Sequence, residues 1–329
     1  MSIHEAYCVQ LERVVSITEA RTEFLSRSPC KRFDFLCSTE SCRQRGVKII
    51  GINYDHFPDE IRQSPHFKYR TTNNRLHSPE CQWCQTITER LVGESEEEYK
   101  IRKMRSRLHD FIDEFQLPED EFELSERTKK TATKTASKRE QRDASSTIKT
   151  TQQQKRYIIT NQLMRLVEVY LDARRNLPEK DFLALPLKVT NSSVKFLYQY
   201  FRRAENAIKD KHKCVCIGEV EFFDRAELLY FKLRKPYQED KSAPPIPICL
   251  GIRKSILETY RYRRMLRSHI DSNPYEHKYF KVYFIPNEND FNLKTVKNKE
   301  GKETDIYFFE IDDLNLFCLF NYSYLKKKK

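Results

Sequence analysis

The spacing of hydrophobic residues in the first third of the chain predicts helices at both ends and short strands between them. Apolar residues recur at helical spacing between Leu11 and Ile17, with charged residues on the other face, which predicts a helix over residues 1–29. Residues 86–116 return to helical spacing, and Pro118 ends that helix. Alternation or flanking glycines predict strands at 32–37 and 46–52, within a small β-rich module that continues through residues 64–81.

The second half of the chain combines helical spacing with several β-like runs. Helices are predicted over residues 157–175, 193–207 and 253–269. Runs rich in Val, Ile, Phe and Tyr predict strands at 213–223, 227–233, 246–250, 279–285, 305–311 and 314–320. This pattern indicates an α+β fold with a five- to six-stranded sheet, which a small barrel of the oligonucleotide-binding kind would fit.

Residues 125–156 differ in kind from the rest of the chain. They hold ten basic and three acidic residues, with many Thr, Ser and Gln and almost no apolar side chains. Such a segment buries too little surface to offset its ordering entropy, which predicts a disordered linker. The predicted domains are therefore a module with flanking helices at 1–124, the linker at 125–156 and an α+β domain at 157–329. The linker is either a basic arm for phosphates or a solvated tether.

The chain carries a formal net charge of +12 over 329 residues. A basic surplus of this size favours polyanionic partners, with nucleic acid (DNA or RNA) first and an anionic membrane surface second. We expect no membrane insertion, because no apolar run approaches the ~18 residues that cross a bilayer. The N-terminus lacks a basic region followed by an apolar core, so a cytoplasmic protein is expected. Nothing indicates a small-molecule substrate.

Cysteines crowd into the N-terminal region and predict a metal site. Cys37 and Cys42 form one close pair, and His77 and Cys81 form a second pair after an intervening loop of 34 residues. Two such pairs on separate turns suit a tetrahedral zinc ion, and four protein ligands close its shell, as in a structural Zn²⁺ site. Three other residues are alternatives to a named ligand: Cys84, His66 and Cys30.

This region resembles the zinc segment of the competence protein CoiA family, over about seventy residues. The similarity rests on short matching motifs: Phe35–Cys37, Cys42, Pro65–Phe67, His77, Cys81 and Gly93–Glu98. Two family histidines are replaced here, one by Tyr69 and one by Glu98. The resemblance implies a zinc module in a DNA-related protein.

The nuclease part of that family needs an Asp followed by a Glu-x-(Gln/Lys) strand. Asp271, Glu276 and Lys278 have the required residue types. Their spacing is too short to place both carboxylates on adjacent strands around a metal. The resemblance therefore does not extend to nuclease activity.

A second group of candidate functional residues lies in the predicted helix 253–269. Cations alternate there with two aromatic residues, and Glu258 is the only acidic residue among them. Such a surface could clamp phosphates and stack a base, or it could simply be solvated. The candidate nucleic-acid contacts are Arg253, Lys254, Tyr260, Arg261, Tyr262, Arg263, Arg264 and Arg267.

No catalytic signature is found: the chain has no phosphate-binding Gly-rich loop, Gly-x-Ser-x-Gly or His-Glu-x-x-His. The leading hypothesis is therefore a zinc-containing nucleic-acid-binding protein. One rival is a divergent metal-dependent nuclease that uses Glu219, Glu221 and Asp224. The other is a zinc-dependent interaction subunit that docks a protein partner in a larger complex.

Overall fold

The computed structural model describes most of the chain in several ranges. These are residues 4–27, 31–57, 65–69, 77–78, 81, 90, 93–117, 158–273, 279–297, 301 and 303–321. Helices and strands occur in both halves, so the predicted α+β class is confirmed. The predicted linker, 125–156, lies outside the described residues.

The N-terminal part is built on a five-stranded antiparallel sheet of order β2-β1-β3-β4-β5. Its strands are β1 (Glu5–Cys8), β2 (Arg13–Ser16), β3 (Phe35–Cys37), β4 (Lys48–Ile52) and β5 (His66–Tyr69). The predicted strands 32–37 and 46–52 correspond to β3 and β4, and β5 lies in the part of the predicted β-rich module where no separate strand was predicted. Two helices accompany the sheet, α1 (Ile17–Ser26) and α2 (Glu40–Gln44).

The predicted helix over 1–29 is wrong for its first half, where β1 and β2 form a hairpin. Glu12 adopts a positive φ of 54° in the turn, so no glycine or proline marks the reversal in the sequence. The helix starts only at Ile17 and has a capping box at its N-terminus. The Glu19 amide donates to the Ser16 hydroxyl, and the Ser16 amide donates to the Glu19 carboxylate.

A small three-stranded parallel sheet of order β7-β6-β8 links the N-terminal part to the rest. It consists of β6 (Glu114–Phe115), β7 (Ile159–Thr160) and β8 (Lys188–Val189). Among the described residues of the predicted helix 86–116, only α3 (Glu96–Arg105) is helical. After it, Leu108, Ile112 and Phe115 turn inward and join the larger hydrophobic core.

The C-terminal part is built on an eight-stranded sheet of order β14-β15-β12-β11-β10-β13-β16, with β9 paired to β10. Its strands are β9 (Phe201–Arg203), β10 (Val215–Asp224), β11 (Leu228–Leu233), β12 (Ile248–Arg253), β13 (Tyr279–Phe284), β14 (Leu293–Lys297), β15 (Glu303–Glu310) and β16 (Phe317–Asn321). All six predicted strands have counterparts here. Over the described ranges the sheet does not close, since β14 and β16 remain at opposite ends, so the barrel-like form is not found.

The helices of this part are α5 (Leu163–Asn176), α6 (Glu179–Leu183), α7 (Ala204–Asp210), α8 (Lys254–Thr259) and α9 (Arg263–Asp271). Short 3₁₀ segments are η2 (Leu197–Tyr200), η3 (Glu288–Phe291) and η4 (Leu314–Leu316). The predicted helix 157–175 corresponds to α5. The predicted helix 193–207 is wrong over most of its length, because it contains η2 and β9 and becomes α-helical only at Ala204. The predicted helix 253–269 is divided into α8 and α9.

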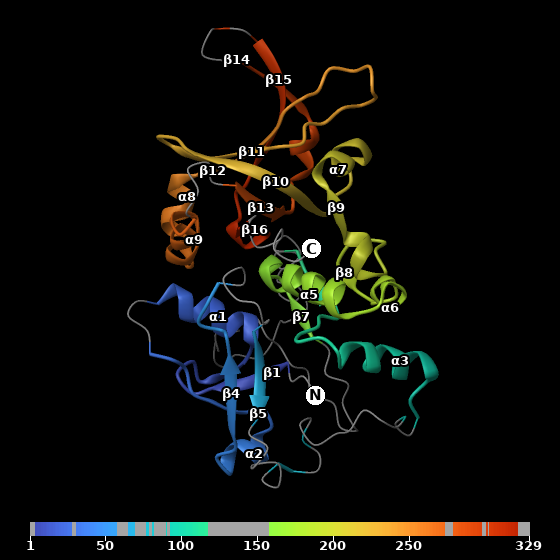
Figure 1. Ribbon diagram of the computed structural model, residues 1–329, viewed down its shortest axis with the longest axis vertical. Coiled ribbons are helices and arrows are strands. Elements are labelled where there is room, and N and C mark those ends of the chain that lie inside the picture. The colour runs from blue at the N-terminus through green and yellow to red at the C-terminus, as the bar shows by residue number, and fades with distance from the viewer. Residues whose placement is uncertain are drawn as a thin grey trace, which may run out of the picture.

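The core of the larger sheet lies on the face that carries Val220, Phe231 and Leu250, where Leu257 of α8 and Leu266 of α9 also pack. Figure 1 shows α5 below β16, between the two large sheets, and α8 and α9 beside the larger one. A second, smaller cluster fills the N-terminal sheet and includes Cys37, Cys42 and Cys81.

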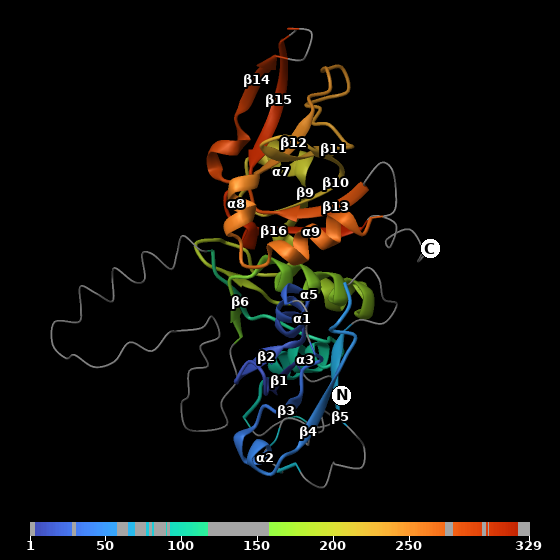
Figure 2. The same ribbon diagram turned by 90° about the vertical axis from the view of Figure 1, so that its left-hand side faces the viewer.

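Helix α1 connects the two large sheets: it packs on α5 and on α9, as Figure 2 shows for its position beside α5. None of the helices in the described ranges has both the length and the apolar composition needed to cross a membrane.

Candidate functional site

The four predicted metal ligands come together in the smaller core. Cys37 ends β3, Cys42 lies in α2, and His77 and Cys81 come from the later segment. One donor atom from each residue can be chosen so that all four lie within 4.8 Å of one another, and all four residues are buried. The structure therefore confirms that this set could hold a metal ion.

The backbone around the first ligand pair is held by main-chain hydrogen bonds. The Cys37 amide donates to the Val47 carbonyl over 2.9 Å, and the Val47 amide donates to the Cys42 carbonyl over 3.2 Å. Gly46 makes the intervening turn at a φ of 71°, a conformation that glycine adopts at little cost. Both thiols are therefore fixed in place by the return of the chain into β4.

The donor atoms are in direct contact. Cys81 Sγ lies 3.5 Å from Cys37 Sγ and 3.4 Å from His77 Nδ1. The hydrogen bond to the Cys81 sulfur, followed by burial, raises the pKa of the Cys37 thiol well above its ordinary value. A metal cation bound among these sulfurs would instead lower the pKa of the thiols, because metal binding displaces thiol protons.

Three polar groups outside the ligand set stabilise negative charge on two of the sulfurs. Cys42 Sγ accepts from the Ser78 amide at 3.1 Å and from Arg45 Nη2 at 3.5 Å. Cys81 Sγ accepts from the Thr39 hydroxyl at 3.4 Å. Such contacts orient ligands and favour the thiolate. These three residues carry no signal of their own in the sequence and were not predicted, although each lies within three positions of a candidate ligand.

The chemistry of the donor set fits a closed metal site. Three thiols and one imidazole are the soft ligands typical of tetrahedral structural zinc, and a full set of four protein ligands leaves no position for substrate. Two of the alternative ligands, Cys30 and Cys84, lie outside the described residues. His66 does not belong to the group; it lies on β5, and its ring centroid is 5.5 Å from that of His109.

The predicted nucleic-acid contacts are brought to one side of the larger sheet, but several of their charges are paired with acids. Lys254 Nζ lies 2.6 Å from Asp224, and Arg261 Nη2 lies 2.6 Å from Glu23. Ion pairs of the same kind join Arg253 to Glu310 and Arg267 to Glu258. These pairs reduce the positive field available to a phosphate.

Tyr260 and Tyr262 are partly buried rather than presented for stacking. Burial raises the pKa of both hydroxyls, that of Tyr262 to about 12. Tyr260 packs on the larger core, and the Tyr262 hydroxyl donates to Glu23 over 3.2 Å. Arg263 and Arg264 remain exposed at the start of α9, and within the described ranges no carboxylate pairs with either of them.

The carboxylates of the nuclease rival do not form a metal site with other described residues. Glu219 and Asp224 are exposed on β10, and each contacts a cation, Arg234 at 3.7 Å and Lys254 at 2.6 Å respectively. Across the described residues, the Cys/His group is the only cluster of three or more possible ligands. Glu276 and Lys278 lie outside those residues.

Comparison with known proteins adds no family assignment: no protein-family model, curated protein or solved structure matches the chain.

Proposed function

We propose that Cys37, Cys42, His77 and Cys81 hold a structural Zn²⁺ ion, and that the protein binds nucleic acid through its cationic surface. The convergence of four soft donor atoms within 4.8 Å in a buried core carries the zinc proposal. The bound Zn²⁺ ion would cross-link β3 and α2 to His77 and Cys81. A reducing compartment such as the cytoplasm would keep the three thiols available as ligands.

Charge supports nucleic acid as the partner. The chain has twelve more basic than acidic residues, and seven of these surplus charges lie in the segment 125–156. On the described surface, Arg263 and Arg264 add two exposed guanidinium groups. The resemblance of the ligand segment to the CoiA family is consistent with such a role. Binding of this kind is mainly electrostatic, so its affinity falls steeply with salt.

The test combines metal analysis of the purified full-length protein with fluorescence anisotropy on labelled DNA and RNA at low and physiological salt. We expect about one zinc ion per chain, as four ligands imply, and a Kd that rises strongly with salt. Absence of zinc would refute the metal proposal. A protein that contains zinc but binds no nucleic acid at low salt would refute the binding proposal.

A second candidate, a protein-interaction subunit, is favoured by the exposed edge strand β14. All five of its residues are exposed, including Leu293 at 47% and Val296 at 39%. Edge strands with apolar side chains can add a strand from a partner. A defined complex in a pull-down, together with no nucleic-acid binding, would support this candidate.

A further inference from the structure

One face of the larger sheet carries a row of partly exposed aromatic side chains. Successive residues of a strand point to opposite faces, and the face opposite the core holds Phe223 of β10, Tyr230 of β11 and Phe308 of β15. Phe223 and Tyr230 are direct cross-strand partners, and Phe308 is the partner of Cys249 on β12. We call this surface the outer sheet face.

Its aromatic rings are held in position by the sheet. The centroids of Phe223 and Tyr230 are 6.1 Å apart, and the Tyr230 hydroxyl contacts Cys249 Sγ at 2.7 Å. Phe308 lies over Gly251, where an added Cβ would be only 2.5 Å from its ring. The missing side chain at Gly251 therefore makes room for this ring on the outer sheet face.

Basic side chains lie within cation–π distance of these rings. The Arg225 guanidinium lies 5.8 Å from the Phe223 ring centroid and 5.7 Å from that of Tyr230. Lys294 Nζ lies 5.3 Å from the Phe308 centroid, on the neighbouring strand β14. Lys232 is exposed on β11, two positions after Tyr230 and on the same face. Three acidic residues also lie on this face. Glu221 is half-buried and is the direct cross-strand partner of Lys232. Glu219 pairs with Arg234, and Glu310 pairs with Arg253.

The helices described above leave these rings partly exposed. Leu257 of α8 and Leu266 of α9 pack in the core on the opposite face, and α5 packs against β16 at the far end of the sheet. Phe223, Tyr230 and Phe308 each keep an intermediate exposure. A ligand can therefore reach the edges and outer surfaces of these rings without displacing a helix.

We infer that the outer sheet face binds single-stranded nucleic acid, with unpaired bases on the aromatic rings and phosphates at Arg225, Lys232 and Lys294. This inference rests on the proposed nucleic-acid binding and names its substrate class and surface. Aromatic rings interleaved with cations on an open sheet suit bases that are free to stack. A duplex keeps its bases stacked on one another, and its major groove accepts a helix or a two-stranded ribbon rather than a broad sheet.

The test uses the full-length protein and a labelled oligothymidine strand, its RNA counterpart and a DNA duplex of equal length. Phe223→Leu and Phe308→Leu remove the flat rings but keep apolar side chains over the sheet. Tyr198→Leu is the matched control, because Tyr198 is 37% exposed on η2, outside the outer sheet face. Metal content and circular dichroism verify that each variant folds.

We expect the wild type to prefer single strands to the duplex, and each Phe→Leu change to weaken single-strand binding by about fivefold or more, as loss of base stacking implies. The control should bind as the wild type does. If the wild type binds nucleic acid but prefers the duplex, or if folded Phe→Leu variants bind like the control, this inference fails while the proposed function stands. If the wild type binds no nucleic acid at all, the proposed function itself fails.

Discussion

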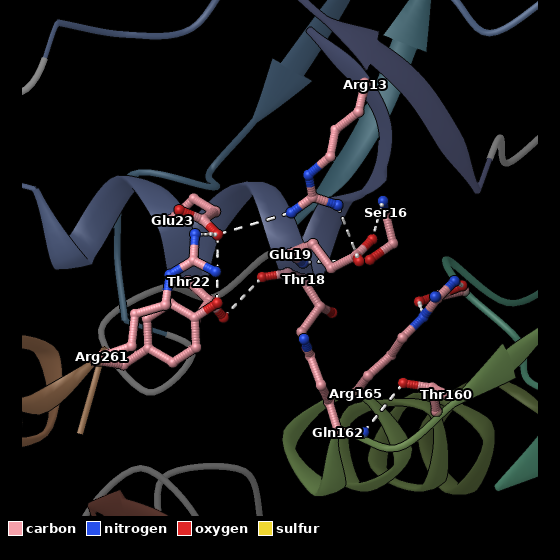
Figure 3. A network of polar contacts seen from close by, with 12 residues as sticks. Arg13, Ser16, Thr18, Glu19, Thr22, Glu23, Thr160, Gln162, Arg165 and Arg261 are labelled. Carbon is pink, nitrogen blue, oxygen red and sulfur yellow. Dashed lines mark hydrogen bonds and ion pairs between the residues drawn. The ribbon is translucent and has the colours of Figure 1, made fainter. Parts of the chain in front are cut away.

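Arg261 donates from Nη2 to Glu23 Oε1 over 2.6 Å, and this contact joins residues that are 238 positions apart. The Tyr262 hydroxyl donates to the same oxygen over 3.2 Å, and Arg13 approaches Glu23 from the N-terminal hairpin at 3.6 Å (Figure 3). The Glu23 side chain is only 5% exposed. Two residues that the sequence suggests as phosphate and base contacts thus anchor α1 to the segment before α9.

Glu23→Gln should destabilise the contact between the N-terminal and C-terminal parts. The substitution removes the negative charge that Arg13 and Arg261 share and leaves these cations facing an amide. Loss of one partner of a buried ion pair typically lowers the free energy of unfolding by about 3–5 kcal/mol. Because the Arg261 side chain is 67% exposed, we expect a smaller decrease of about 1–3 kcal/mol. Thermal unfolding would measure the loss.

Glu258→Gln is the control for this effect, because Glu258 pairs with Arg267 where both side chains are more than half exposed. An exposed pair contributes about 0–1 kcal/mol. Equal shifts in melting temperature for the two variants would contradict the role assigned to Glu23.

The buried pair Asp110–Arg165 should be far more sensitive to single substitutions than to joint replacement. Arg165 donates from Nε and Nη2 to the two carboxylate oxygens over 2.8 and 3.0 Å, and both side chains are at most 5% exposed. Asp110→Leu leaves an uncompensated buried guanidinium, so we expect a loss of about 3–5 kcal/mol.

In the double variant Asp110→Leu/Arg165→Met no such charge remains, and we expect it to be more stable than Asp110→Leu alone. Urea unfolding of the two single variants, Asp110→Leu and Arg165→Met, and of the double variant tests this point. A double variant that is as unstable as the sum of the two single variants would show that the pair has no coupling of this kind.

Cys42→Ser should abolish stable metal binding and unfold the smaller core, because serine replaces a soft thiolate ligand with a poor one. Cys8→Ala is its matched control: Cys8 is equally buried in the same core but does not belong to the ligand group. Metal content after dialysis against a mild chelator distinguishes them. Zinc retained by Cys42→Ser would remove Cys42 from the ligand set. Zinc lost equally from both variants would mean that metal loss reports disruption of the core rather than loss of a ligand.

Gly251→Ala should destabilise the larger sheet by about 1–3 kcal/mol, because its methyl group would collide with Phe308 and with Leu228. Adding Phe308→Leu should recover part of this loss, since the shorter side chain can move away. A double-mutant cycle in thermal unfolding measures the coupling. Strictly additive effects would mean that the Phe308 ring moves aside without cost.

The cluster of possible metal ligands was predictable because its signal is local. Each pair of ligands lies within five positions, and soft donor atoms are rare enough that two such pairs stand out in a sequence. Six of the eight strands of the larger sheet were also predictable from their β-branched and aromatic runs, whereas the short β9 and the exposed β14 were not predicted. Neither signal requires knowledge of which segments become neighbours.

The errors occur where a distant partner overrides local spacing. Residues before Ile17 have helical spacing, yet β1 pairs with β3 and turns through Glu12, which carries no turn signal. Phe201 fits a helix in the sequence, but it lies in β9, whose parallel partner is β10. The pairing of Arg261 with Glu23 depends on the packing of α1 against α9. The sequence of residues 253–269 does not contain this information, so Arg261 was predicted to be available for a phosphate.

The closure of the smaller core at Cys81 sets an order of events during synthesis. That core can be complete once residue 81 has left the ribosome, and N-terminal units generally fold first. Helix α1 then already carries Thr18 and Glu23, but their partners Glu168 and Arg261 are translated later. The nascent N-terminal part must therefore stay in solution with a polar docking surface, and the charges of α1 that later hold the protein together would first keep this surface hydrated.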